Sequence, residues 1–221
     1  MRRRLSGGGT AIGWATTHQD HAPQPTAAVA GTLDPPDAPS VDASREIGSA
    51  TQSARATEPR PLQLPPSHPE RLRIPAIELD STLQALGLNP DGTLQVPAPG
   101  PFYNEAAWFD HSPTPGELGP SVVEGHIDSA KEGPSVFLRL GAVRPGEQVL
   151  VTRADSSTAV FTINAVRRYP KDNFAIETVY GDTGRGAALR LITCGGTFDR
   201  VTRNYRDHIV VFADLTATTA P

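Results

Sequence analysis

Short apolar runs separated by turn-forming residues dominate the chain from about residue 70 onward. Residues 71–74 alternate polar and apolar side chains, as a half-buried strand does. Residues 148–152 and 159–166 read as two strands joined by a hairpin tip at 154–157. Such closely spaced short runs are typical of an all-β domain.

Further strands are expected at residues 121–124, in the run that leads to Cys194, and at 208–213. The turn sequence at 89–92 precedes a predicted short strand at 93–96. We expect residues 97–120, which are rich in proline, to be mostly loop.

The pattern does not fix the secondary structure of two regions. Residues 137–140 fit either a strand or one helical turn, and residues 170–186 form a long connection with a short helix near 175–180. No long amphipathic helix is predicted. The pattern therefore favours a barrel or sandwich of about eight short strands.

Composition divides the chain. Residues 1–68 are rich in Ala, Pro, Thr and Ser and poor in large apolar side chains, which predicts a disordered spacer. We assign 69–216 to one folded domain and 217–221 to a C-terminal tail. His18 and His21 lie in the spacer and are read as ordinary polar residues rather than a metal site.

The N-terminus begins with Met1 and three arginines, like the basic start of an export signal, but the next residues form a poor apolar segment. Either this is an exposed flexible start or it is a shortened anchor. The sequence contains no run of about 20 apolar residues, so no transmembrane helix is predicted.

Charge and cysteine content reduce the number of function classes that the sequence allows. The net charge is −4, and no basic stripe with interleaved aromatic residues points to nucleic acid. The single cysteine, Cys194, cannot form an internal disulfide, and no Cys/His spacing suggests zinc, so no metal or cofactor is predicted.

Three chemically capable residues fall at predicted strand ends: Cys194 before a Gly-Gly pair, His126 after residues 122–125, and Arg206 before the last strand. A thiolate is a strong nucleophile, an imidazole exchanges protons near neutral pH, and a guanidinium can stabilise an oxyanion. Taken alone, each has a plainer interpretation: a core cysteine, a loop histidine and a surface arginine. Their shared placement favours a cysteine acyl-transfer site with Cys194 as nucleophile, His126 as acid/base and Arg206 as clamp.

The motifs resemble those of sortases, the cysteine transpeptidases of Gram-positive cell surfaces, and most closely the actinobacterial class often labelled F. The resemblance spans about residues 70–215. Its motifs lie at 73–77, 90–94, 115–120, 125–128, 144–147, 192–196 and 205–207.

The resemblance implies an eight-stranded sortase β-barrel with short helices, in which Cys and Arg lie at the ends of the last two strands and His lies across a groove. It implies cleavage of a Leu-Pro-x-Thr-Gly-like signal between Thr and Gly, and transfer of the acyl group to a peptidoglycan amine. The partners would be surface proteins that carry sorting signals, with no nucleic acid, and we expect a monomer at the extracytoplasmic cell surface. Sortases are normally membrane-anchored, and no convincing anchor is evident here.

Some choices stay open at this point. Arg206 is preferred because it lies nearest the last strand, with Arg203 as the second choice and Arg200 as the third. Glu124 and Asp128 flank His126 and either tune it or are simply solvated. An L,D-transpeptidase is disfavoured because that family places His and Gly shortly before the Cys. A non-catalytic peptide-binding protein on the same barrel is the main alternative, since fold does not prove activity.

Overall fold

Eight strands close into a barrel in the computed structural model, which describes residues 22–25, 61–181, 183–184 and 186–220. Around the barrel the order is β1-β2-β3-β4-β9-β10-β8-β7. The strands are β1 (Pro69–Ile74), β2 (Leu79–Leu86), β3 (Ala106–Phe109), β4 (Gly119–Glu124), β7 (Gln148–Arg153), β8 (Thr158–Pro170), β9 (Ala187–Asp199) and β10 (Asn204–Thr219). The prediction of an eight-stranded barrel is confirmed.

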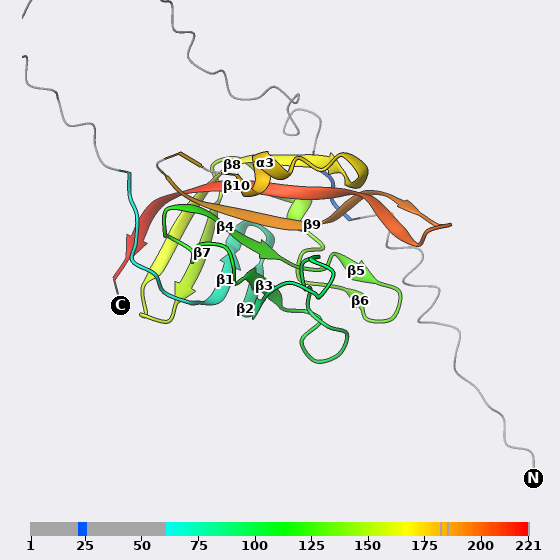
Figure 1. Ribbon diagram of the computed structural model, residues 1–221, viewed down its shortest axis with the longest axis horizontal. Coiled ribbons are helices and arrows are strands. Elements are labelled where there is room, and N and C mark those ends of the chain that lie inside the picture. Colours follow the sequence, from blue (N-terminus) through cyan, green and yellow to red (C-terminus); the bar gives the residue numbers. More distant parts are fainter. Residues whose placement is uncertain (1–21, 26–60, 182, 185, 221) are drawn as a thin grey trace, which may run out of the picture.

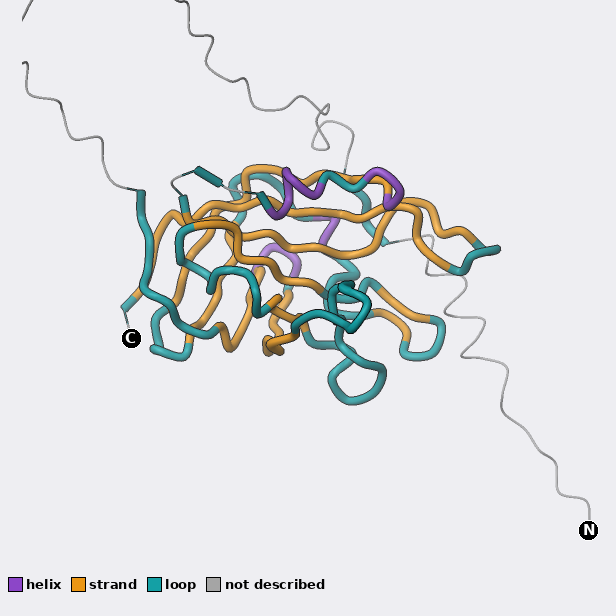
Figure 2. Tube along the Cα trace, viewed as in Figure 1, coloured by secondary structure: helices purple, strands orange, loops and turns teal. Residues whose placement is uncertain are grey.

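Helical structure is short and peripheral. The segments are η2 (Pro75–Ile77), η3 (Leu140–Ala142), η4 (Lys171–Asn173) and α3 (Ile176–Tyr180). Figures 1 and 2 show α3 on the same side of the molecule as the long strands β8 and β10. Val179 of α3 is buried in one apolar cluster with residues of β4, β9 and β10. A two-stranded hairpin of β5 (Asp128–Ser129) and β6 (Gly133–Pro134) stands apart from the barrel.

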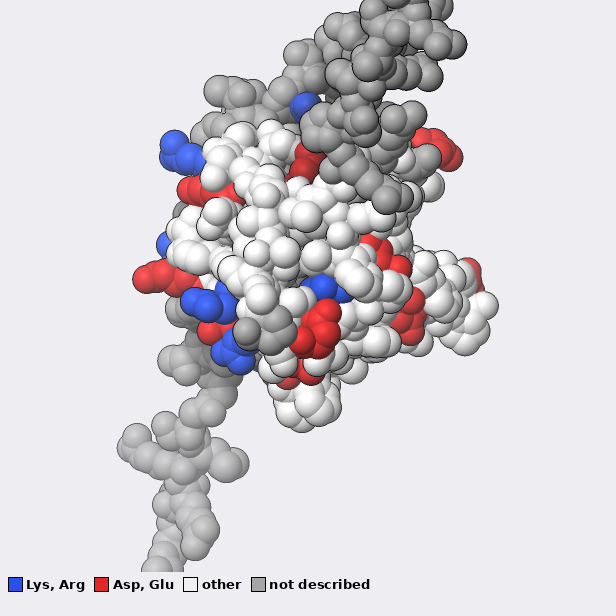
Figure 3. All heavy atoms as spheres, turned by 90° about the vertical axis from the view of Figure 1, so that its left-hand side faces the viewer, with Lys and Arg blue, Asp and Glu red and all other residues white. Residues whose placement is uncertain are grey.

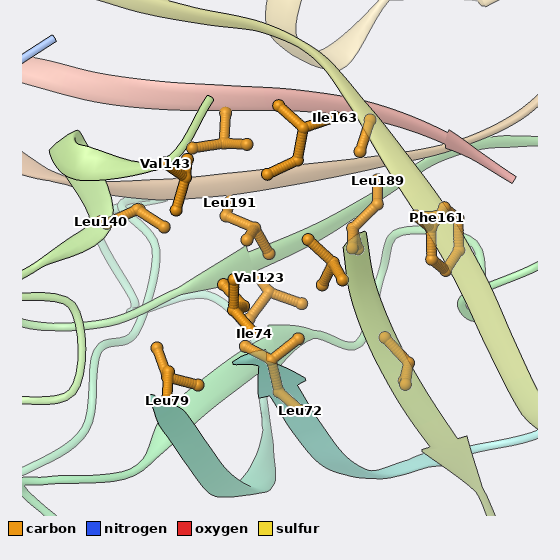
Figure 4. Packing of buried hydrophobic residues seen from close by; sticks show 14 of the residues in the cluster. Leu72, Ile74, Leu79, Val123, Leu140, Val143, Phe161, Ile163, Leu189 and Leu191 are labelled. Carbon is orange, nitrogen blue, oxygen red and sulfur yellow. The ribbon is translucent and has the colours of Figure 1, made fainter. Parts of the chain in front are cut away.

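The core fills the barrel with alternate side chains from the strands, as a small closed barrel requires. Leu72 and Ile74 of β1, Leu189 and Leu191 of β9 and Phe161 of β8 are fully buried in it. Figure 4 shows these side chains converging from different strands. A second cluster on the outer face of β9 and β10 packs beneath α3.

Two strands of the barrel were not predicted, and neither were the two short strands β5 and β6. β2 and β3 pair in parallel, with Leu83 opposite Ala106, and β3 lies inside the segment expected to be loop. The predicted strand at 93–96 is wrong, because among the described residues this segment contributes only an isolated bridge between Leu88 and Leu94. Residues 137–140 form turns that lead into η3.

The Gly-Gly pair does not end its strand, which corrects the sequence-based expectation. β9 continues to Asp199, and the register moves from Gly195 opposite Asp207 to Phe198 opposite Tyr205. Two residues of β9 therefore lie opposite one residue of β10, Arg206. This two-to-one pairing is a β-bulge. Gly196 has a φ of +74°, a conformation that glycine adopts without strain.

Much of the predicted spacer lies outside the described residues, including His18 and His21. Its described parts contact the barrel. The Leu64 N–H donates to the Gly116 carbonyl at 2.7 Å, and the Gly196 N–H donates to Gln24 Oε1 at 2.8 Å. The division of the chain at residue 68 stays a prediction.

No described helix has the length and apolar character needed to cross a membrane. On the face shown in Figure 3, acidic and basic side chains are intermixed, with wide uncharged surface between them. This face carries no field of a single sign.

Candidate active site

A pocket of about 860 Å³ opens at the end of the barrel where the β5–β6 hairpin and the β9–β10 hairpin project together. The two hairpins are joined by a hydrogen bond from the Tyr205 hydroxyl to Asp128 Oδ2 at 2.8 Å. Cys194 and His126 both line this pocket. Two residues far apart in the sequence thus line the same pocket.

Cys194 is partly buried in β9, directly opposite His208 of β10. It packs at the edge of a small apolar cluster built on Ala22, Ile127 and Tyr205. The neighbouring Thr193 donates from Oγ1 to the Gly125 carbonyl at 2.8 Å. This bond fixes the strand that carries the thiol to the turn that carries His126.

His126 follows the end of β4, as the sequence predicted. Its Nε2 lies 2.8 Å from the Pro97 carbonyl oxygen, and a carbonyl oxygen can only accept, so Nε2 carries the hydrogen. Its ring stacks on Tyr103, with centroids 4.8 Å apart and an interplanar angle of 17°. The loop that follows the Leu88–Leu94 bridge therefore orients the imidazole.

The three candidate arginines differ in their position relative to the pocket. The Arg206 side chain is 67% exposed, and its Nη2 forms an ion pair with Asp199 Oδ2 at 3.1 Å. Arg200 and Arg203, from the turn between β9 and β10, line the pocket. The structure brings Cys194 and His126 together and leaves the Arg206 guanidinium outside the pocket lining.

Sequence reasoning missed Lys171, whose Nζ lies 3.4 Å from Cys194 Sγ. It lies in the connection after β8, and no local pattern signals that it meets the cysteine. Only the placement of β8 next to β10, and of β10 next to β9, reveals this contact.

Two partly buried ionisable groups lie close to these residues. Glu124, at the end of β4, has its pKa raised to about 7, chiefly by burial, while the Tyr180 hydroxyl at 3.5 Å opposes that rise. Burial raises the pKa of Asp128, and the hydrogen bond from Tyr205 counteracts it. The described residues contain no group of three or more His, Cys, Asp or Glu side chains that could hold a metal ion.

A sequence model of the sortase domain matches residues 72–216, which is most of the chain and nearly the whole barrel. The chain belongs to the sortase family. A comparison with curated protein sequences gave no match.

Solved sortase structures share this barrel. Sortase C from Streptococcus pneumoniae is similar at a TM-score of 0.52 and 16% identity, covering 68% of this chain and 69% of its own. The SrtA sortase from Actinomyces oris is similar at 0.51 and 16% identity, covering 75% and 89%. A lid mutant of sortase A from Corynebacterium diphtheriae is similar at 0.51 and 16%, covering 66% and 69%. At such identities the likeness establishes the sortase fold.

Proposed function

We propose that this sortase is a class F-like cysteine transpeptidase that cleaves a Leu-Pro-x-Thr-Gly-like signal between Thr and Gly. The observation that carries the proposal is the meeting of Cys194 and His126 in one pocket. A sulfur nucleophile and a proton-exchanging imidazole are the minimum for acyl transfer through a thioester.

In the first step, Cys194 Sγ as thiolate forms a bond with the threonyl carbonyl carbon. The carbon–nitrogen bond to glycine then breaks, and His126 supplies the proton that the leaving amine needs. In the second step, a peptidoglycan amine attacks the thioester, its proton passes to His126, and the thiolate is released. With water as acceptor, the same site would act as a slow protease.

Negative charge develops on the carbonyl oxygen in both steps and needs a donor. We retain Arg206 for this role, as the sequence suggests. To serve, its guanidinium must leave Asp199, which holds it 3.1 Å away, and turn toward the thiol. Arg203 is the competing candidate, because it already lines the pocket.

The expected partners are surface proteins that carry sorting signals, and the expected location is the extracytoplasmic surface of a Gram-positive, actinobacterial cell. We propose a monomer. Family membership supports the surface location and the kind of partner, and the motifs at 125–128 and 192–196 support the class F-like assignment.

The test is cleavage of a panel of fluorogenic Leu-Pro-x-Thr-Gly peptides, with and without an amine acceptor. Wild type should cleave at least one peptide, and the amine should divert product from hydrolysis to transfer. Cys194→Ala and His126→Ala should each abolish turnover. If wild type binds the peptides and Cys194→Ala matches it in every assay, the barrel is a non-catalytic peptide-binding domain.

A further inference from the structure

Lys171 reaches across the sheet to the nucleophile. It is the first residue of η4, directly after β8, and β10 lies between β8 and the strand that carries Cys194. Its Nζ donates to Cys194 Sγ at 3.4 Å. This distance is within hydrogen-bonding range for sulfur, which is a large and diffuse acceptor.

A second contact holds the ammonium group in place. Lys171 Nζ also donates to Asn204 Oδ1 at 2.8 Å, at the start of β10. Asn204 is a neutral amide, so this hydrogen bond positions the lysine without neutralising its charge. The lysine side chain is only partly exposed, which reduces the screening of its field by water.

The imidazole nearest along the sheet adds no competing charge. His208 lies opposite Cys194 in β10 and opposite Tyr169 in β8. Burial, together with the smaller effect of the Lys171 charge, lowers the pKa of His208 to about 4. His208 is therefore neutral at pH 7, and the lysine provides the positive charge on this side of Cys194.

The pocket side of Cys194 is lined by groups of both signs. His126 and Asp128 come from the segment after β4, and Arg200 and Arg203 come from the β9–β10 turn. Lys171 does not line the pocket, so a peptide bound there would leave its contact with Sγ in place.

We infer that Lys171 is a further catalytic residue, whose ammonium stabilises the Cys194 thiolate from the side opposite the peptide. When the Sγ proton passes to His126, the electron pair left on sulfur is held by the adjacent positive charge. The same charge favours sulfur as leaving group when the amine displaces it from the thioester. The inference rests on the proposed function for turnover, whereas the thiolate itself can be measured without any substrate.

The measurement is the rate of Cys194 alkylation by iodoacetamide, followed by intact mass from pH 6 to pH 9 on the full chain. The chain has one cysteine, so all alkylation reports on this thiol. Lys171→Met should slow alkylation at pH 7 by about tenfold, and Lys171→Arg should restore most of the rate because it keeps the charge. Asn204→Ala should slow it less than Lys171→Met, since it loosens the ammonium without removing it.

Thermal melts check that each variant is folded, and Asn204→Ala serves if Lys171→Met does not fold. If Lys171→Met folds and its alkylation rate is within twofold of wild type, the inference is overturned. If only Asn204→Ala folds, an alkylation rate within twofold of wild type in that variant overturns the inference. Peptide turnover is scored separately. If wild type cleaves no peptide but its alkylation depends on Lys171, the proposed function fails and the role of Lys171 at the thiol stands. If peptides are cleaved and alkylation is independent of Lys171, the proposed function stands and the role of Lys171 at the thiol fails.

Discussion

The ring of Tyr103 lies stacked on the imidazole of His126, with centroids 4.8 Å apart and planes 17° from parallel. Together with the hydrogen bond from Nε2 to the Pro97 carbonyl, this contact fixes where the imidazole can deliver a proton. Tyr103 is almost fully buried, so its ring is a rigid support.

Replacing that support should impair catalysis more than binding. Tyr103→Leu removes the flat surface, and we expect kcat to fall by about tenfold or more, because a small misplacement of a catalytic group is costly. Tyr103→Phe keeps the ring and is the matched control, with kcat within about threefold of wild type. Equal kcat values for Tyr103→Leu and wild type would show that stacking does not position His126.

The identity of the catalytic arginine is settled by a pair of variants. We expect Arg206→Ala to lower turnover by at least about 10²-fold while Cys194 remains alkylatable, as loss of an oxyanion donor would. Arg203→Ala should have a smaller effect, through peptide binding. If Arg203→Ala produces the large loss and Arg206→Ala does not, the clamp is the arginine that already lines the pocket.

Glu124 should make stability depend on pH. Its pKa is about 7 in the folded protein against an ordinary 4.5, so the folded state retains a proton that the unfolded state releases. The free energy of unfolding should therefore fall as pH rises from about 4.5 to about 7. His208 acts in the opposite direction, because its lowered pKa makes stability rise with pH between about 4 and 6.5.

Comparison with Glu124→Gln isolates the carboxyl, since the His208 contribution is common to both proteins. The stability of Glu124→Gln relative to wild type should increase by roughly 2–3 kcal/mol between pH 4.5 and pH 8. Urea denaturation at several pH values measures this difference. A difference that stays constant across this range would mean that Glu124 is not protonated in the folded protein near neutral pH.

The bulge after Cys194 requires glycine for two separable reasons. Gly196 has a φ of +74°, and an added Cβ would overlap the Asp207 carboxylate. Gly146 has a φ of +91° with no atom within 4 Å of an added Cβ, which makes it the matched control.

Gly146→Ala should cost about 1 kcal/mol of unfolding free energy from backbone strain alone. Gly196→Ala should cost at least about 2 kcal/mol, because strain and overlap add. Thermal or urea denaturation checks both values. Equal losses would show that Asp207 moves aside at little cost.

Local patterning was enough to predict the strands that alternate clearly or lie beside strong turns, such as 71–74 and the 148–166 hairpin. β2 was not predicted because a polar residue occupies one of its buried positions, which interrupts the apolar pattern. This residue is Ser81, and its Oγ accepts a hydrogen bond from the Ala106 N–H at 3.0 Å. β3 was not predicted because it is a four-residue strand whose parallel partner is distant in sequence.

In the site, too, local sequence patterns predict some features, whereas others depend on contacts between distant segments. The type and position of Cys194 and His126 are visible in the sequence, because each follows a recognisable apolar run. The contact of Lys171 with Cys194 depends on the barrel order β9-β10-β8, which no local pattern contains. The placement of Arg206 depends on the bulge at Gly196, which reads in the sequence as a strand end.

The central claim is that Cys194 forms a thioester with a sorting peptide. Intact mass spectrometry of the wild-type chain mixed with a Leu-Pro-x-Thr-Gly peptide and quenched in acid measures this directly. We expect an adduct equal to the acyl fragment up to threonine, confined to Cys194, absent in Cys194→Ala and removed when an amine acceptor is added. A protein that binds the peptide but shows no such adduct at any time point would contradict the account.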